Sequence, residues 1–228
     1  NEVDNYRQDH YQLHFSHRLS STFKVNLKGH YTRGRGYYEQ YRIAEDFATY
    51  GFTPIILTVD TVSNTDLIRR RWLDNHFFGG IFSINYKKKG VEITFGGGAN
   101  QYIGSHFGEV IWAEYASDSE IRDRYYDNDG SKVEVQSYVK GTWRLKRMTF
   151  FGDLQYRHID YDFLGIDDVS GSIEEVNLNA SYDFINPKVG LMIDFDNRNN
   201  AYLSFAMANR EPVRADFREN TFSNRPKH

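Results

Sequence analysis

Apolar side chains recur at every second position through most of the chain, with polar side chains between them. The segments with this period are 11–15, 23–31, 78–86, 91–99, 133–142, 148–156, 178–193 and 203–207. A period of two is typical of β-strands that expose one apolar and one polar face. We therefore predict an all-β, antiparallel fold of about eight consecutive strands.

The predicted strands are joined by connections that alternate in length. Short turns are expected near 17–22, 87–90, 144–147 and 194–200, and long connections at about 33–75, 103–132 and 160–176. Loops of more than about 12 to 15 residues are uncommon in compact soluble domains. Barrels of the bacterial outer membrane have short periplasmic turns and long extracellular loops. The pattern thus favours a transmembrane β-barrel with all its long loops on the outside.

The polar positions of the strands fit the same interpretation. The residues that we expect to point inward are Lys24, Asn26, Lys28, His30, Gln136, Lys140, Gln155 and Arg157. A barrel in lipid needs an apolar outer face, whereas its lumen can be wet and charged. A soluble β-sandwich with one solvated face shows the same alternation and remains an alternative.

The direction of the strands bears on how much of a barrel is present. If the short turns are periplasmic, the first strand descends from the outside and the last strand ascends toward it. Eight strands closing on themselves would also leave a lumen filled by side chains. We expect these strands to be an internal arc of a larger barrel. A self-contained outer-membrane barrel that acts as an enzyme or adhesin is the other alternative.

Composition excludes several classes of protein. Tyrosine, phenylalanine and tryptophan make up 16% of the chain, which is enough bulky surface to exclude a disordered protein. No run approaches the roughly 18 to 20 apolar residues that a membrane-spanning helix needs. The absence of cysteine excludes disulfides and thiolate zinc sites. A net charge of -3 with interspersed signs makes nucleic acid an unexpected partner.

Aromatic residues in the long connections are the candidates for ligand contact, because they offer large rigid surfaces with a polar group. They are Tyr37, Tyr38, Tyr41, Trp72, Trp112, Tyr115, Tyr125 and Tyr126.

No catalytic, cofactor or metal site is expected. The sequence contains no nucleophile elbow, phosphate-binding loop or zinc-protease motif. Acidic residues gather in 103–132 and 160–176, and 127–130 resembles part of a calcium loop. Tyr125 and Gln136 occupy the first and twelfth positions of that loop, where a calcium loop has carboxylates, so the motif fails. His10, His14 and His30 are the only histidines expected in the lumen, and they lack ligand spacing.

Several segments resemble a known family. Residues 202–217 read YLSFAMANREPVRADF, and 153–157, 182–190 and 4–12 read DLQYR, YDFINPKVG and DNYRQDHYQ. These segments are similar to strands of TonB-dependent outer-membrane receptors of the Bacteroidetes type. We interpret Arg210, Glu211 and Pro212 as the structural mark of a strand-to-loop transition, where proline ends ladder pairing.

The resemblance implies a barrel of about 22 strands in the outer membrane of a Gram-negative bacterium. Residues 1–228 would be a partial barrel domain, with the plug domain and the TonB box absent from this chain. The implied function is not enzymatic. It is import of a scarce nutrient, a ferric siderophore or haem above others. The implied partners are outer-membrane lipid and lipopolysaccharide, the remaining strands and plug, the TonB complex, and a surface lipoprotein or ligand.

Overall fold

A computed structural model describes residues 2–169 and 172–212, without the side chains of 167–169 and 172–174. It contains one large sheet, one small hairpin and one short helix. The strands of the large sheet are β1 (Val3–Arg18), β2 (Phe23–Asp46), β5 (Asn64–Lys88), β6 (Val91–Ala113), β7 (Arg124–Leu145), β8 (Met148–Val169), β9 (Ser172–Asp194) and β10 (Asn200–Ala206). The connection between β2 and β5 holds α1 (Phe47–Tyr50), β3 (Ile55–Ile56) and β4 (Thr61–Val62).

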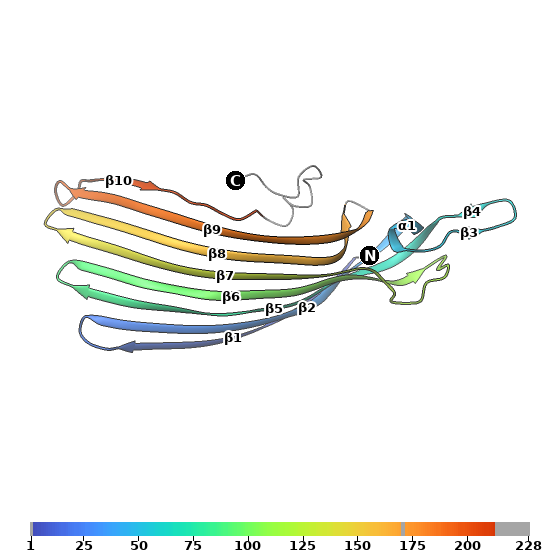
Figure 1. The fold of residues 1–228 in the computed structure, drawn as a ribbon, viewed down its shortest axis with the longest axis horizontal. Coiled ribbons are helices and arrows are strands. Elements are labelled where there is room, and N and C mark those ends of the chain that lie inside the picture. The colour runs from blue at the N-terminus through green and yellow to red at the C-terminus, as the bar shows by residue number, and fades with distance from the viewer. Residues whose placement is uncertain (1, 170–171, 213–228) are drawn as a thin grey trace.

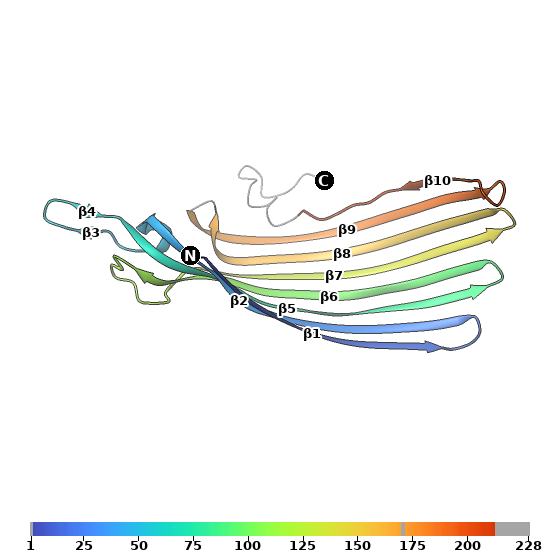
Figure 2. The ribbon, with the colours of Figure 1, turned by 180° about the vertical axis from the view of Figure 1, so that it is seen from behind.

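The large sheet is antiparallel, and its strands follow one another in chain order. The eight predicted strands are confirmed. Figure 1 shows the four short turns together at one end, here called the turn end, and α1 with β3 and β4 at the other, the loop end. Figure 2 shows from behind that the hairpin of β3 and β4 projects beyond the strands of the large sheet. Because the strands form a single layer, the soluble sandwich is wrong.

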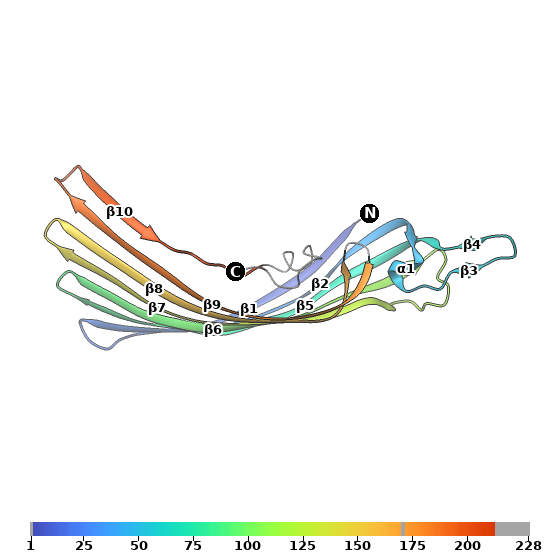
Figure 3. The ribbon, with the colours of Figure 1, turned by 45° about the horizontal axis from the view of Figure 1, so that its top comes forward.

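The sheet is curved, with a concave and a convex face (Figure 3). Among the described strands β1 and β10 lie at opposite edges and do not pair with each other, so the eight strands do not close into a barrel. Glu211, in the segment that follows β10, contacts Lys132 and Arg157. That segment passes over the hollow side in Figure 3, so these two side chains lie on the concave face.

Strand pairing places residues of like polarity in rows across the sheet. One convex row contains Val25, Ile84, Phe95, Val139, Leu154 and Pro187. The next row, shifted by one residue, contains Asn26, Ser83, Gly96, Tyr138, Gln155 and Asn186 on the concave face. The two rows differ in polarity because successive side chains of a strand point to opposite faces of the sheet. The inward assignment of the eight polar residues named above is confirmed.

The apolar band of the convex face has a measurable height. Along β2 it runs over the nine residues from Phe23 to Tyr31, and the next convex residue is Arg33. Along β5 it ends at Phe78, the partner of Tyr31, and His76 follows. A tilted strand crosses the hydrocarbon core of a bilayer with about 9 to 11 residues. The band is therefore long enough for one crossing. No helix of the described residues is long and apolar enough to span a membrane.

The predicted long connections are mostly strand, which corrects their boundaries. β2 runs to Asp46 and β5 starts at Asn64, so that only 47–63 connect them, and only 114–123 connect β6 to β7. β8 and β9 extend to Val169 and from Ser172. Above the apolar band both faces of a strand are wet, so the strands continue without the alternation that reveals them. Residues 170 and 171 and the side chains of Asp167, Asp168 and Glu174 lie outside the described residues.

The same correction removes the calcium-loop motif. Residues 127–130 lie inside β7 and pair with β6 and β8. An extended strand cannot wrap around an ion as a calcium loop does.

Candidate functional site

The connection between β2 and β5 folds back into a compact structure at the loop end. The carboxylate of Asp46 accepts a hydrogen bond from the backbone N–H of Ala48 at 2.9 Å and so caps α1. Gly51 ends this single turn with a left-handed φ of 73°. The two caps turn Phe47 and Tyr50 inward, and both side chains are buried.

A small apolar core joins this connection to the ends of three long strands. Its buried residues are Phe47, Tyr50, Phe52, Leu67, Val110, Tyr125 and Tyr126. The rings of Tyr50 and Tyr125 are 4.7 Å apart, and those of Tyr125 and Tyr126 are 5.0 Å apart. We call this group the loop-end core. It holds the outermost connections to the ends of β5, β6 and β7.

One polar chain enters the loop-end core. The hydroxyl of Tyr50 donates to Oε2 of Glu45 at 2.6 Å and accepts from Nη1 of the buried Arg69 at 2.9 Å. Burial raises the pKa of Tyr50 above its usual value, so that the phenol remains a hydrogen-bond donor at neutral pH. The guanidinium of Arg69 also donates to Oε1 of Gln40 at 3.2 Å. These bonds fix the angle at which the connection leaves the sheet.

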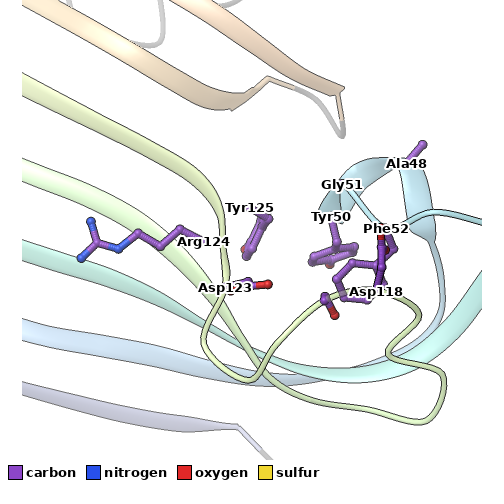
Figure 4. Close-up of a pocket in the computed structure, with 9 residues that line it drawn as sticks. Ala48, Tyr50, Gly51, Phe52, Asp118, Asp123, Arg124 and Tyr125 are labelled. Carbon is purple, nitrogen blue, oxygen red and sulfur yellow. The ribbon is translucent and has the colours of Figure 1, made fainter.

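A cavity of about 370 Å³ opens beside the loop-end core (Figure 4). Its lining residues are Ala48, Tyr50, Gly51, Phe52, Asp118, Ser119, Asp123, Arg124 and Tyr125. Figure 4 shows that the side chain of Arg124 points away from the other lining residues, and its guanidinium carbon lies 3.8 Å from the ring centroid of Phe107. The cavity therefore presents aromatic rings and two carboxylates.

Side chains of the 114–123 connection attach it to Thr53, which follows α1, and the hydroxyl of Ser117 donates to the carbonyl oxygen of Thr53 at 2.5 Å. Asp118 accepts hydrogen bonds from the backbone N–H of Thr53 at 3.1 Å and from its hydroxyl at 2.8 Å. The hydroxyl bond is the largest cause that lowers the pKa of Asp118. The carboxylate is therefore ionised at neutral pH, when these bonds are strongest.

The eight candidate aromatic residues separate into groups. Four of them lie on the convex face, namely Tyr37, Tyr41, Trp72 and Trp112, and Tyr38 lies on the concave face. Two belong to the loop-end core, Tyr125 and Tyr126. Tyr115 follows β6. Seven of the eight lie in strands, so their expected position in loops is wrong except for Tyr115. Of the eight, only Tyr125 lines the cavity, together with two aromatic residues that the sequence did not single out, Tyr50 and Phe52. Ligand contact by the eight residues stays a prediction.

A second hollow lies on the concave face and has a volume of about 560 Å³. Its lining residues are Gln8, His10, Gln12, His30, Thr32, Asn75, Phe77 and Tyr102. The imidazole of His10 is 3.0 Å from Oγ1 of Thr32, and that of His30 is 3.0 Å from Oδ1 of Asn100. Within the described residues no three His, Asp or Glu side chains are placed to hold a metal ion.

The segment after β10 is fixed to the concave wall by an ion-pair network. β10 ends at Ala206, and the side chain of Asn209 donates to the carbonyl oxygen of Ile185 at 3.2 Å. One oxygen of Glu211 is 2.5 Å from Nζ of Lys132, and the other is 3.4 Å from Nη2 of Arg157. Arg157 also pairs with Glu134 at 3.0 Å. Arg210, Glu211 and Pro212 do follow a strand end, and Glu211 additionally fastens the segment.

Replacing Glu211 with glutamine is expected to release this segment. The four charged side chains of the network are about one-fifth to one-third exposed. The free energy that holds the segment should therefore fall by an amount between the values for surface and buried ion pairs, about 1 to 2 kcal/mol. Hydrogen exchange of the amides of 207–211 in the intact receptor should become about tenfold faster. Glu92→Gln, which removes an exposed carboxylate paired with Lys87 at the turn end, is the matched control. Unchanged exchange in Glu211→Gln would show that the network does not hold the segment.

One local signal could have located α1 in advance. Four residues separate Asp46 from Gly51, as they separate an N-cap from a C-terminal glycine around one helical turn. No comparable signal predicts the cavity, because its residues come from two connections that are distant in the sequence.

Solved structures similar to this chain include import receptors and a transporter. The ferric-catecholate import receptor Fiu from Escherichia coli K12, in its open form, matches 92% of this chain and 37% of its own with a TM-score of 0.68 and 15% identity. The ferric citrate transporter FecA matches 87% of this chain and 27% of its own, with a TM-score of 0.55 and 14% identity. The siderophore receptor PiuA from Acinetobacter baumannii matches 89% of this chain and 32% of its own, with a TM-score of 0.55 and 10% identity. At these identities the likeness establishes the fold.

The chain spans about a third of the length of these structures. No curated protein sequence matches it. A family model described as TonB dependent receptor-like, beta-barrel matches residues 1–226. Barrels of this family lie in the outer membrane of Gram-negative bacteria and serve transport, which agrees with the apolar convex band and the polar concave wall. Nothing in these matches supports the Bacteroidetes type in particular. The chain belongs to the TonB-dependent receptor family, as part of its β-barrel.

Proposed function

We propose that this chain forms part of the barrel of a receptor that imports a ferric siderophore. The observation that carries the proposal is the family match over residues 1–226, on a sheet with one lipid-compatible and one wet face. The similar structures Fiu, FecA and PiuA are receptors for ferric catecholate, ferric citrate and a siderophore. In this proposal the plug, the TonB box and the other strands lie outside this chain, and the TonB complex supplies the energy.

The charge of the concave wall supports an anionic cargo. Lys24, Lys28 and Lys140 point to this face, and no ion pair joins their ammonium groups to any described residue. Positive charges that line a cavity raise the local concentration of anions. Ferric chelates of catecholates and carboxylates are anions. Haem is also anionic, but His10 and His30 are hydrogen-bonded to Thr32 and Asn100, so a siderophore is the better candidate.

Growth on defined iron sources tests the proposal. Cells that depend on the intact receptor should grow with a ferric catecholate or ferric citrate as the sole iron source, and cells without it should not. A triple Lys24→Gln, Lys28→Gln, Lys140→Gln variant should reduce uptake several-fold, because the field of the wall weakens. Lys87→Gln, Lys88→Gln, Lys89→Gln at the turn end is a control of equal charge change. The siderophore proposal would be refuted if the receptor supported growth on haem but on no ferric chelate. It would also be refuted if the receptor supported growth on none of these iron sources.

A further inference from the structure

The cavity beside the loop-end core lies on the concave side of the wall. Gln40 precedes the convex Tyr41 and therefore faces the concave side, as does its partner on β5, Arg69. Nη1 of Arg69 donates to the hydroxyl of Tyr50, which lines the cavity, at 2.9 Å. The cavity and the proposed cargo path are therefore on the same side of the wall.

The floor of the cavity is aromatic and buried. The side chains of Tyr50, Phe52 and Tyr125 line it and are 5 to 7% exposed. The ring centroid of Tyr50 is 6.1 Å from that of Phe52 and 4.7 Å from that of Tyr125. The face of an aromatic ring attracts a cation that lies within about 6 Å of its centroid. We call these three residues the aromatic floor, which can hold both the methylene groups and the charged end of a ligand.

The charged side chains that face the cavity are negative. Asp118 and Asp123 contribute carboxylates, and both residues are exposed. Oδ2 of Asp123 accepts a hydrogen bond from the backbone N–H of Glu120 at 2.7 Å, and within the described residues no hydrogen bond reaches its Oδ1. The guanidinium of Arg124 pairs with Asp127 at 2.6 Å and points away from the other lining residues (Figure 4). A ligand in this cavity therefore meets negative charge beside aromatic rings.

The volume and place of the cavity limit what can occupy it. Its volume of about 370 Å³ is near the lower end of the range for small-molecule sites, about 300 to 1,000 Å³. A ferric siderophore wraps its iron in several bidentate groups and is too large for it, so only an arm of such a cargo fits. Gln40 and Lys28 lie twelve residues apart on β2, which is about 40 Å at 3.3 Å per residue. The cavity therefore acts at the entrance, before the cargo reaches the lysines of the wall.

We propose that the cavity binds an ammonium group on the cargo, so that the imported ferric siderophore carries a positively charged arm. The N–H groups of a primary ammonium donate charge-assisted hydrogen bonds to the carboxylates of Asp118 and Asp123, and its methylene chain lies on the aromatic floor. The inference rests on the proposed import of a ferric siderophore and adds the chemical group that the entrance selects. The lysines then attract the anionic chelate in a second step.

Two small probes test the ammonium site without iron. Butylammonium and the neutral N-butylacetamide are added to the purified intact receptor in detergent, and their binding is measured by saturation-transfer NMR. The wild type should bind butylammonium about tenfold more tightly than the amide. Asp123→Asn should lose that factor, which corresponds to about 1.4 kcal/mol, because the amide oxygen can still accept from Glu120 but carries no charge. Glu120→Gln, the matched control, removes a carboxylate of the same connection that does not line the cavity and should leave both affinities unchanged.

A pair of ferric chelates connects the site to the cargo. One is a ferric catecholate with an aminopropyl arm, and the other is the same chelate with that arm acetylated. The wild type should bind the amine form several-fold more tightly. Asp123→Asn should abolish this difference and leave the affinity for the acetylated form unchanged, which shows that the variant is folded.

The outcomes separate this inference from the proposed function. Equal affinities of the wild type and Asp123→Asn for butylammonium would overturn the inference, as would equal affinities of the wild type for the two chelates. If butylammonium bound through Asp123 while neither chelate was bound or taken up, the ammonium site would be supported and the siderophore proposal refuted.

Discussion

Replacing Leu27 with arginine should prevent most of the receptor from assembling in the outer membrane. Leu27 lies in the middle of the apolar band, between Phe15 and Phe82 on the neighbouring strands. An arginine on the lipid face near the midplane of a bilayer costs about 2 to 4 kcal/mol. Ile93→Arg and Leu203→Arg, on the same face, should act in the same direction. The measurement is the fraction of receptor with the electrophoretic mobility of folded barrel in membranes from intact cells.

Neighbouring residues provide the control for this result. Asn26 precedes Leu27 and points to the concave face, where its side chain donates to Oγ of Ser83 at 3.0 Å. Asn26→Arg, Thr94→Arg and Ser204→Arg put the same charge against the wet face and should assemble nearly as well as the wild type. If the two sets of variants assembled equally, the assignment of the lipid face would be wrong.

Replacing Phe47 with alanine should unfold the connection between β2 and β5 while the barrel wall stays intact. Phe47 is 1% exposed, and its ring is 5.6 Å from that of Phe52. Truncation of a buried phenylalanine costs about 3 to 5 kcal/mol. This local loss exceeds what a single helical turn and the short β3–β4 hairpin can contribute by themselves. Protease added to intact cells should cut within 47–63 much faster than in the wild type.

Ile56 is the matched control because it lies in the same connection and is 83% exposed. Ile56→Ala should change the local free energy of unfolding by no more than about 0.5 kcal/mol. If protease cut 47–63 equally slowly in Phe47→Ala and in the wild type, the loop-end core would not hold the connection.

Local sequence features could predict most of the wall and little of the loop end. The alternation of Asn26 with Leu27, or of Thr94 with Ile93, reveals which face each side chain occupies, because water and lipid demand opposite polarities. Beyond Tyr31 both faces of β2 are wet, so Arg33 and Tyr37 carry no period. The strand continues there because its backbone pairs with β1 and β5, and the side-chain pattern does not record that pairing.

The candidate aromatic residues illustrate the same limit. Composition drew attention to Tyr125 and Trp72, and both were expected in loops. A bulge in the pairing of β6 and β7 at Gly108 and Glu109 accompanies the burial of Tyr125 beside Tyr50. Trp72 instead lies on the convex face, above the band. Only the three-dimensional position separates a core residue from a surface contact of the same type.

The sequence by itself determined the number of strands in the sheet, their order, the position of the short turns and the polarity of each face. These properties depend on neighbours along the chain and on a strict period of two. The tertiary structure decided how far the strands extend, how the loop-end core assembles, and that Glu211 reaches Lys132 across 79 residues. Those contacts join segments whose spacing in the chain follows no period, so packing and charge pairing in three dimensions select them.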